Sequence, residues 1–201
     1  MFNWLTAQDA RALAPAPKRL PIQEGYILVG FLALILLTRG HHLATTWMLP
    51  DASWALFFAA GFFLSVSAQG ILLLAAVAID AYAVGWAGVS DFCITWAYAA
   101  LFVAYNVLWL AGRLAAQARS RLQVGGYAIL GASVCELVSS GSFYWWSGYF
   151  EPSWQAFPQH IATYYAQSLG IFCFYVVLGA ALLQVWKKLD AQINLIRSSH
   201  P

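Results

Sequence analysis

The sequence predicts an all-α, polytopic membrane protein in which six transmembrane helices form one bundle over residues 1–201. The first observation is composition: 62% of the 201 residues are hydrophobic and only 9% are charged, whereas soluble domains average about 45–50% and about 25%. So few charged side chains cannot cover a soluble globule of this size, and lipid must therefore contact most of its surface. The second observation is that nine of the ten Lys and Arg residues fall in three short segments.

The apolar stretches have lengths that suit membrane-spanning helices, which need about 20 residues. Pro50 cannot continue a helix, and Asp51 or Ser53 can cap the helix that follows, so a second helix is expected from residue 53. The stretch 54–88 carries a single charge, at Asp80, and hydropathy alone fits either one overlong helix or two helices parted at residues 65–70. With two helices there, the six expected helices are 22–38, 53–68, 71–88, 94–112, 125–142 and 161–186.

The placement of the basic residues decides between these alternatives, because short cytoplasmic loops of membrane proteins carry an excess of Lys and Arg. The nine clustered residues lie in the N-terminal tail, between residues 113 and 121, and in the C-terminal tail: Arg11, Lys18, Arg19, Arg113, Arg119, Arg121, Lys187, Lys188 and Arg197. Six spans put all nine on one side of the membrane, whereas five spans separate the middle cluster from the first. We therefore expect both termini in the cytoplasm and residues 39–53, 88–95 and 144–160 at the outer face.

Several classes of enzyme find no support in the sequence. It contains no phosphate-binding loop, nucleophile elbow, HExxH zinc motif or dinucleotide fingerprint, and no histidine in mid-span that could ligate haem. Its three cysteines form neither a CxxC pair nor a disulfide framework,. The expected partners are the lipid bilayer and a small ligand, with no nucleic acid.

Cys93 stands out among the residues of the expected outer face. It ends the short polar break Ser90-Asp91-Phe92-Cys93, and no second cysteine is expected on that side to pair with it. A thiolate there could ligate a soft transition metal or act as a nucleophile. The neighbouring candidates His41 and His42 are consecutive, so on a helix they would point about 100° apart and would not chelate one ion. The favoured interpretation is that they form the polar end of the first helix.

Asp80 and Glu136 lie inside expected spans, where an ionisable side chain is costly and marks either a transport pathway or a buried partner. Glu136 has Ser133, Ser139 and Ser140 within about one turn, which favours structural hydrogen bonding between helices. Asp80 follows the small-residue stretch 75–79, which allows close helix approach. For both residues we favour a structural role over transport chemistry.

Three stretches within the first four expected helices form a combined pattern. They read His41-His42-Leu43-Ala44-Thr45, Leu49-Pro50-Asp51-Ala52-Ser53 continuing through 57–62, and Gly88-Val89-Ser90-Asp91-Phe92-Cys93-Ile94-Thr95 with Ala97-Tyr98; residues 140–144 add a further match. This pattern resembles the BtuM family, small proteobacterial membrane proteins related to the substrate-binding S-components of energy-coupling factor (ECF) vitamin transporters. The resemblance implies a six-helix S-component fold, cobalamin (vitamin B12) as the transported ligand, and a cysteine that coordinates the cobalt of the corrin. The matching cysteine here is Cys93.

The loops that flank Cys93 in this topology supply the expected ligand pocket. Its members, besides Cys93, are His41, His42, Asp51, Asp91, Thr95 and Tyr98. Cobalamin is large and edged with amides, so its pocket should combine aromatic faces with hydrogen-bonding groups. A thiolate on one face of the cobalt donates electrons and could weaken the bond to a cyanide on the other face. Removal of that cyanide is therefore a candidate second activity.

The first helix departs from S-components that share an energising module, because Gly30 and Ala33 are the only small residues in its middle and no AxxxA occurs there. We therefore expect a solitary carrier in the bacterial inner membrane, and the need for an energising ECF module stays open. Two other classes also stay open. One is a membrane enzyme with Cys93 as nucleophile and His41 or His42 as base, and the other is a non-catalytic subunit of a larger complex.

Overall fold

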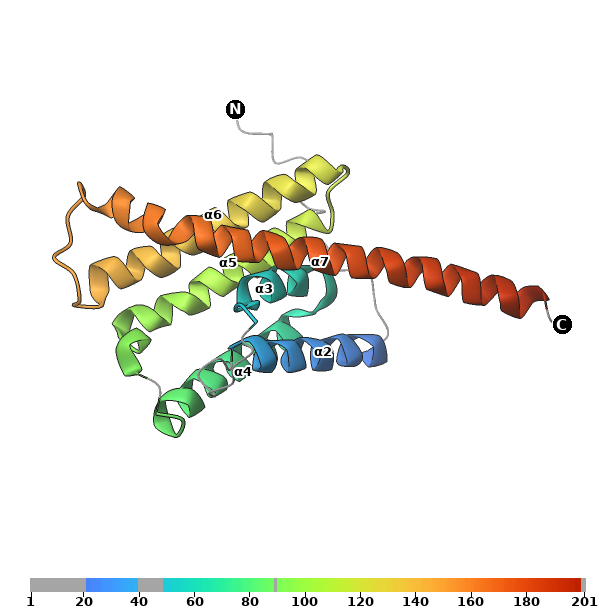
Figure 1. Cartoon of the computed structure of the whole chain (residues 1–201), viewed down its shortest axis with the longest axis horizontal. Helices are drawn as coiled ribbons and strands as arrows, with labels where there is room; N and C mark the ends of the chain where they lie inside the picture. The colour runs from blue at the N-terminus through green and yellow to red at the C-terminus, as the bar shows by residue number, and fades with distance from the viewer. Residues whose placement is uncertain (1–20, 40–48, 89, 200–201) are drawn as a thin grey trace, which may run out of the picture.

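The chain is a bundle of helices, seen in a computed structural model that describes residues 21–39, 49–88 and 90–199. Within these ranges there are six α-helices and two short 3-10 turns, and no strand (Figure 1). The elements are α2 (Pro21–Arg39), α3 (Ser53–Phe63), α4 (Val66–Gly85), η2 (Asp91–Cys93), η3 (Trp96–Ala99), α5 (Ala100–Ala115), α6 (Arg121–Trp146) and α7 (Phe157–Ser199). The prediction of an all-α membrane bundle with six helices is confirmed.

Not all six helices meet the length expected of a span. Among the described residues, four helical segments are long and apolar enough to cross a membrane: Val66–Gly85, Trp96–Ala115, Arg121–Trp146 and Phe157–Gln192. The second helix was expected over 53–68, but α3 ends at Phe63 after 11 residues, which is about 16 Å of helix. Taken alone, α3 is therefore too short to cross a hydrocarbon core of about 30 Å.

The early end of α3 coincides with a helix cap and with a contact from a distant helix. Leu64 is extended, with φ −114° and ψ 145°, and the Ser65 hydroxyl accepts a hydrogen bond from the Ala68 amide at 3.3 Å, which caps the start of α4. The Ser65 amide in turn donates to Glu24 Oε1 at 2.6 Å. The Ser65 hydroxyl accepts from a backbone amide in the first turn of α4 that has no partner within the helix. The next helix therefore begins at Val66 rather than at residue 71.

The other helix boundaries move by one to six residues from those expected, except the end of the sixth helix, which moves from residue 186 to Ser199. The fourth expected helix begins as the 3-10 turn η3, and its α-helical part runs from Ala100 to Ala115. The fifth begins at Arg121 because Ser120 caps it, its hydroxyl accepting from the Gln123 amide at 3.2 Å. The sixth is the 43-residue α7, which extends past the other helices at its C-terminal end (Figure 1).

Helices α2 to α5 alternate in direction. Contacts at the helix ends show that α2 and α4 run the same way, whereas α3 and α5 run the opposite way. Glu24 at the start of α2 binds the start of α4, and Arg39 at the end of α2 binds Asp80 near the end of α4. Arg113, near the end of α5, donates to the Leu64 carbonyl at 3.5 Å. The basic segment after α5 therefore lies at the same end of the bundle as the start of α2. We refer to this end as the basic end and to the opposite end, where η2 lies, as the η2 end.

The short helix α3 occupies the centre of the bundle, and small residues let α5 approach it closely. Gly61 of α3 and Gly112 of α5 face each other so tightly that a Cβ on either would collide with the backbone of the other helix. On the opposite side of α5, Gly131 of α6 leaves room for Ala111. Small residues that bring helix backbones together are a common device of membrane bundles. Near the η2 end, Phe57 of α3 stacks on Tyr105 of α5 with ring centroids 4.3 Å apart.

Candidate functional site

Two adjoining cavities open beside η2, and they share a wall made by Phe92, Tyr98 and Leu101. The larger has a volume of about 640 Å³ and lies between α2, α4 and α5. The smaller has a volume of about 310 Å³ and lies between η3, α6 and α7. Volumes of this order are typical of small-molecule sites, which occur preferentially between the helices of bundles.

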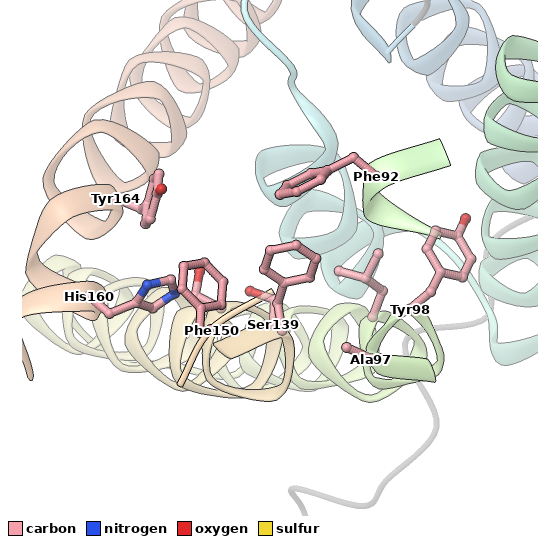
Figure 2. A pocket seen from close by; sticks show the side chains of 10 residues that line it. Phe92, Ala97, Tyr98, Ser139, Phe150, His160 and Tyr164 are labelled. Carbon is pink, nitrogen blue, oxygen red and sulfur yellow. The ribbon is translucent and has the colours of Figure 1, made fainter. Parts of the chain in front are cut away.

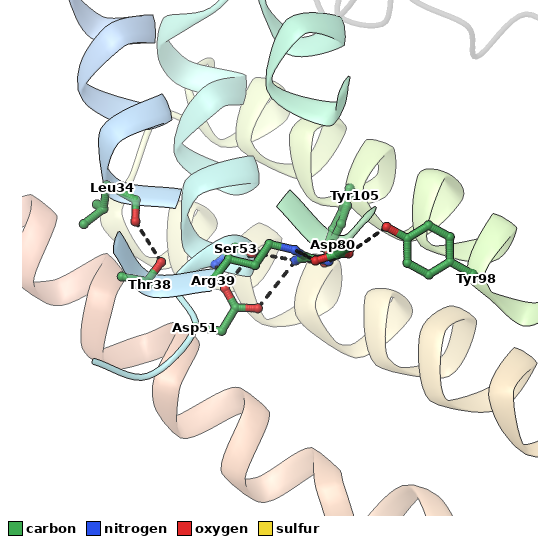
Figure 3. Close-up of polar contacts among 8 residues, drawn as sticks. All are labelled: Leu34, Thr38, Arg39, Asp51, Ser53, Asp80, Tyr98 and Tyr105. Atoms are coloured by element: carbon green, nitrogen blue, oxygen red, sulfur yellow. Dashed lines mark hydrogen bonds and ion pairs between the residues drawn. The ribbon is translucent and has the colours of Figure 1, made fainter. Parts of the chain in front are cut away.

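A polar network centred on Arg39 forms one side of the larger cavity (Figure 3). The Arg39 guanidinium makes a two-pronged contact with Asp80, with Nε donating to Oδ1 at 2.7 Å and Nη2 to Oδ2 at 2.6 Å. Its Nη1 donates to Ser53 Oγ at 2.9 Å and to the Tyr105 hydroxyl at 2.8 Å. Bidentate guanidinium–carboxylate pairs are among the strongest hydrogen-bonded contacts in proteins. The side chains of Arg39 and Asp80 are 11% and 18% exposed.

Asp51 brings a second carboxylate to the same guanidinium. Its Oδ2 lies 3.6 Å from Arg39 Nη1, and its Oδ1 accepts from both the amide and the hydroxyl of Ser53, at 2.9 and 2.6 Å. Tyr98 completes the network by donating its hydroxyl to Asp80 Oδ2 at 2.6 Å. The Arg39 guanidinium thus contacts two carboxylates, those of Asp51 and Asp80. These carboxylates give the wall of the larger cavity several hydrogen-bond acceptors.

Aromatic rings dominate the smaller cavity, as Figure 2 shows. Phe92 of η2 lies against Tyr149 and Phe143, with ring centroids 4.2 and 5.3 Å apart. His160 and Phe150 continue this wall, with centroids 4.9 Å apart. The polar groups that line the smaller cavity are carried by Tyr98, Ser139, Ser140, His160 and Tyr164. The cavity therefore suits the flat face of an aromatic or conjugated ligand edged with polar groups.

The segment between α4 and α5 owes its shape to two serine- and threonine-capped turns. The Ser90 hydroxyl accepts from the Phe92 amide at 3.2 Å, and the Thr95 hydroxyl accepts from the Ala97 amide at 3.2 Å. Gly88 precedes them in the left-handed region at φ +72°, a conformation that glycine adopts at little cost. These turns place Phe92 and Tyr98 between the two cavities.

The structure brings together only some of the residues predicted for the pocket. Asp51 and Tyr98 line the larger cavity and share the Arg39 network. Asp91 is exposed on η2 and Thr95 serves as a cap; neither lines the two cavities. Cys93 is the last residue of η2, and its side chain lies outside the described part of the chain. The prediction for His41 and His42 also lies outside the described residues.

Sequence reasoning missed Arg39 and Tyr105 as members of the network. The signal for Arg39 was present, because it is the one basic residue outside the three clusters and Asp80 is an acidic residue inside a span. A buried carboxylate needs a cation or several donors, so these two residues could have been paired. Glu136 is 2% exposed and accepts a hydrogen bond from Ser140 at 2.6 Å. Of the serines named above, Ser140 therefore bonds that carboxyl group from within α6, and Ser168 of α7 bonds it from a second helix.

Neither a scan against protein-family models nor a search of curated proteins found a match for this chain.

Proposed function

We propose that this chain takes up cobalamin across the bacterial inner membrane, binding the corrin at the η2 end with Cys93 as an axial ligand to cobalt. The observation that carries the proposal is the pair of adjoining cavities on either side of Phe92 and Tyr98. Both cavities lie beside η2, the segment that carries Cys93, and the sequence predicts that the ligand binds next to this segment. The resemblance of the same segment to the BtuM family supplies the identity of the ligand.

The chemistry of the cavity walls supports a ligand of this kind. Cobalamin presents a broad conjugated face and a rim of amides, so it needs aromatic contacts together with acceptors and donors. The smaller cavity offers Phe92, Phe143 and Phe150 as ring faces. The larger cavity offers the carboxylates of Asp51 and Asp80, which accept hydrogen bonds from amide N–H groups,. The two cavities together give a large ligand both kinds of contact.

Cys93 is proposed to hold the metal. Its neighbours in sequence, Phe92 and Ile94, both line the larger cavity. Among the side chains that the structure describes, no group of three His, Cys, Asp or Glu residues could hold a metal ion. A cobalt that arrives within its own macrocycle needs only one protein ligand, and a soft thiolate bonds it well. If the upper ligand is cyanide, it would leave with its bonding electron pair while cobalt keeps its oxidation state.

The first test is the absorbance spectrum of detergent-purified protein incubated with cyanocobalamin. Binding should shift the corrin bands, because a thiolate replaces water or a nitrogen base on cobalt. Cys93→Ser should abolish the shift, since a hydroxyl ionises reluctantly and is a harder ligand. Cys135→Ala and Cys173→Ala are the matched controls and should keep the shift. An unchanged spectrum and affinity in Cys93→Ser would remove the metal-ligand role. Turnover of an acyl substrate without any corrin binding would instead favour the Cys-nucleophile enzyme.

The proposed orientation places both termini in the cytoplasm, with the η2 end outside. Arg113, Arg119 and Arg121 lie at the same end of the bundle as the start of α2, and an excess of basic residues marks the cytoplasmic side. The proposed solitary carrier would have this orientation. In a background without native cysteines, Gln155→Cys should react with an impermeant maleimide in intact spheroplasts. Ser120→Cys should react only after permeabilisation; both positions are exposed. The reverse labelling pattern would invert the orientation and move the cavities to the cytoplasmic side.

A further inference from the structure

Away from these two cavities, an apolar groove of about 600 Å³ lies between α3 and α7, bounded on one side by Phe31 of α2. Among its lining residues only Tyr175 and Trp186 carry a polar side-chain atom. The groove lies where α7 leaves the bundle, since α7 continues past the other helices toward its C-terminus (Figure 1). Ala59 of α3 and Gly179 of α7 are small residues on its two walls, and they leave the groove open.

The groove has two unlike ends. Near Tyr175 its two walls are joined, because the Tyr175 hydroxyl donates to the Pro50 carbonyl, just before α3, at 2.6 Å. At the other end Trp186 is 69% exposed, and Lys187 and Lys188 follow it directly on exposed turns of α7. Asp190 lies within the next turn, and these three residues together leave one positive charge. A tryptophan followed by lysines is typical of the level where a helix leaves the hydrocarbon.

The groove is shorter than the hydrocarbon core of a bilayer. Its lining on α7 runs from Tyr175 to Leu189, fourteen residues or about 21 Å of helix, whereas the hydrocarbon core is about 30 Å thick. A transmembrane helix from a partner would need that full thickness, whereas an acyl chain of the leaflet at the basic end would enter beside Trp186 and run toward Tyr175. We propose that this groove binds an acyl chain of an anionic phospholipid, with the headgroup held by Lys187 and Lys188.

The sign of the charge at the open end selects the headgroup. Lys and Arg near a membrane surface attract anionic lipids, and the effect of each is about fivefold in affinity. Replacing both Lys187 and Lys188 by Gln should therefore weaken phosphatidylglycerol binding by about 25-fold and leave phosphatidylcholine binding nearly unchanged. The matched control is Arg119→Gln with Arg121→Gln, which removes two exposed charges at the same end but away from the groove.

Gly179 provides a direct way to block the groove. A Cβ at Gly179 would meet no atom within 4 Å, so Gly179→Leu can fill the groove without a clash at its first carbon. Gly170→Leu is the matched control, because Gly170 is exposed on the same helix, has the same open space and lies outside the groove. Both variants exchange glycine for a better helix former, so their intrinsic effects on α7 are equal.

The test uses native mass spectrometry of the delipidated full chain, titrated with dioleoylphosphatidylglycerol or dioleoylphosphatidylcholine. These lipids share their acyl chains and differ in the headgroup. We expect one tightly bound phosphatidylglycerol per chain in the wild type and in Gly170→Leu, and its loss in Gly179→Leu. Equal retention in Gly179→Leu, or equal affinity of the wild type for the two lipids, would overturn the proposal. A wild-type dimer that Gly179→Leu dissolves would also overturn it, by giving the groove to a second copy.

Discussion

Replacing Arg39 with Met is expected to lower the stability of the bundle by about 3–5 kcal/mol, the cost of leaving one partner of a buried ion pair alone. The substitution keeps an unbranched, flexible side chain, although a shorter one, and removes every donor that Asp80 receives from α2. Asp80 would retain only the Tyr98 hydroxyl among its described partners. The effect also spreads to α3 and α5, because the same guanidinium holds Ser53 and Tyr105.

Thermal unfolding in detergent measures this effect, and two further variants separate its causes. Tyr98→Phe removes a single hydrogen bond to Asp80 and should cost about 1 kcal/mol. Arg39→Met combined with Asp80→Leu removes both charges, and such apolar replacements of buried pairs are often neutral. The double variant should therefore be more stable than Arg39→Met alone. Equal unfolding temperatures for the wild type and Arg39→Met would show that the pair does not stabilise the fold.

Gly112→Ala is expected to destabilise the chain at or above the upper end of the usual 1–3 kcal/mol for overpacking. Its new Cβ would collide with the Phe58 carbonyl oxygen, and the Cβ of Gly61→Ala would collide with the Trp109 carbonyl oxygen. Backbone atoms cannot turn aside as a flexible side chain can, so α3 and α5 must separate. Because Phe57 stacks on Tyr105 across the same contact, their separation should also disturb the larger cavity.

Unfolding in detergent again gives the measurement, with glycines in open space as controls. Gly126→Ala and Gly170→Ala meet no atom within 4 Å, and exchanging glycine for alanine within a helix stabilises it by up to about 1 kcal/mol. These variants should match or exceed the wild type. A Gly112→Ala protein as stable as the Gly126→Ala control would contradict the close α3–α5 packing.

Local patterns in the sequence determine much of the architecture. The low charge and high apolar content indicate a helical membrane protein, since these quantities report the solvent that the surface meets. Pro50, the Asp51 carboxylate that accepts from the Ser53 amide, and the cap at Ser120 mark helix starts, because such contacts are short-range,. The choice of two helices between residues 54 and 88 is also correct, with the break at Leu64 and Ser65 inside or just before the expected interval.

The length of α3 and the course of α7 depend on packing rather than on hydropathy. The apolar sequence continues through Leu64 without a breaker, but Ser65 binds Glu24 from a helix 41 positions earlier. Similarly, the end of α7 is not fixed by its apolar stretch, since the helix continues through Lys187 and Lys188. Contacts between distant segments cannot be read from a local window of sequence.

The sequence by itself determined the class of protein, the number of helices and the segment beside which the cavities lie, because composition, charge placement and caps act locally. It also identified Asp51 and Tyr98 as residues of interest, while the role of Cys93 stays a prediction. Only the tertiary structure decided that one guanidinium, Arg39, joins α2, α3, α4 and α5 through Asp80, Ser53 and Tyr105. The physical reason is that a buried charge selects its partners by three-dimensional proximity, and the partners of Arg39 are 12 to 66 positions away along the chain.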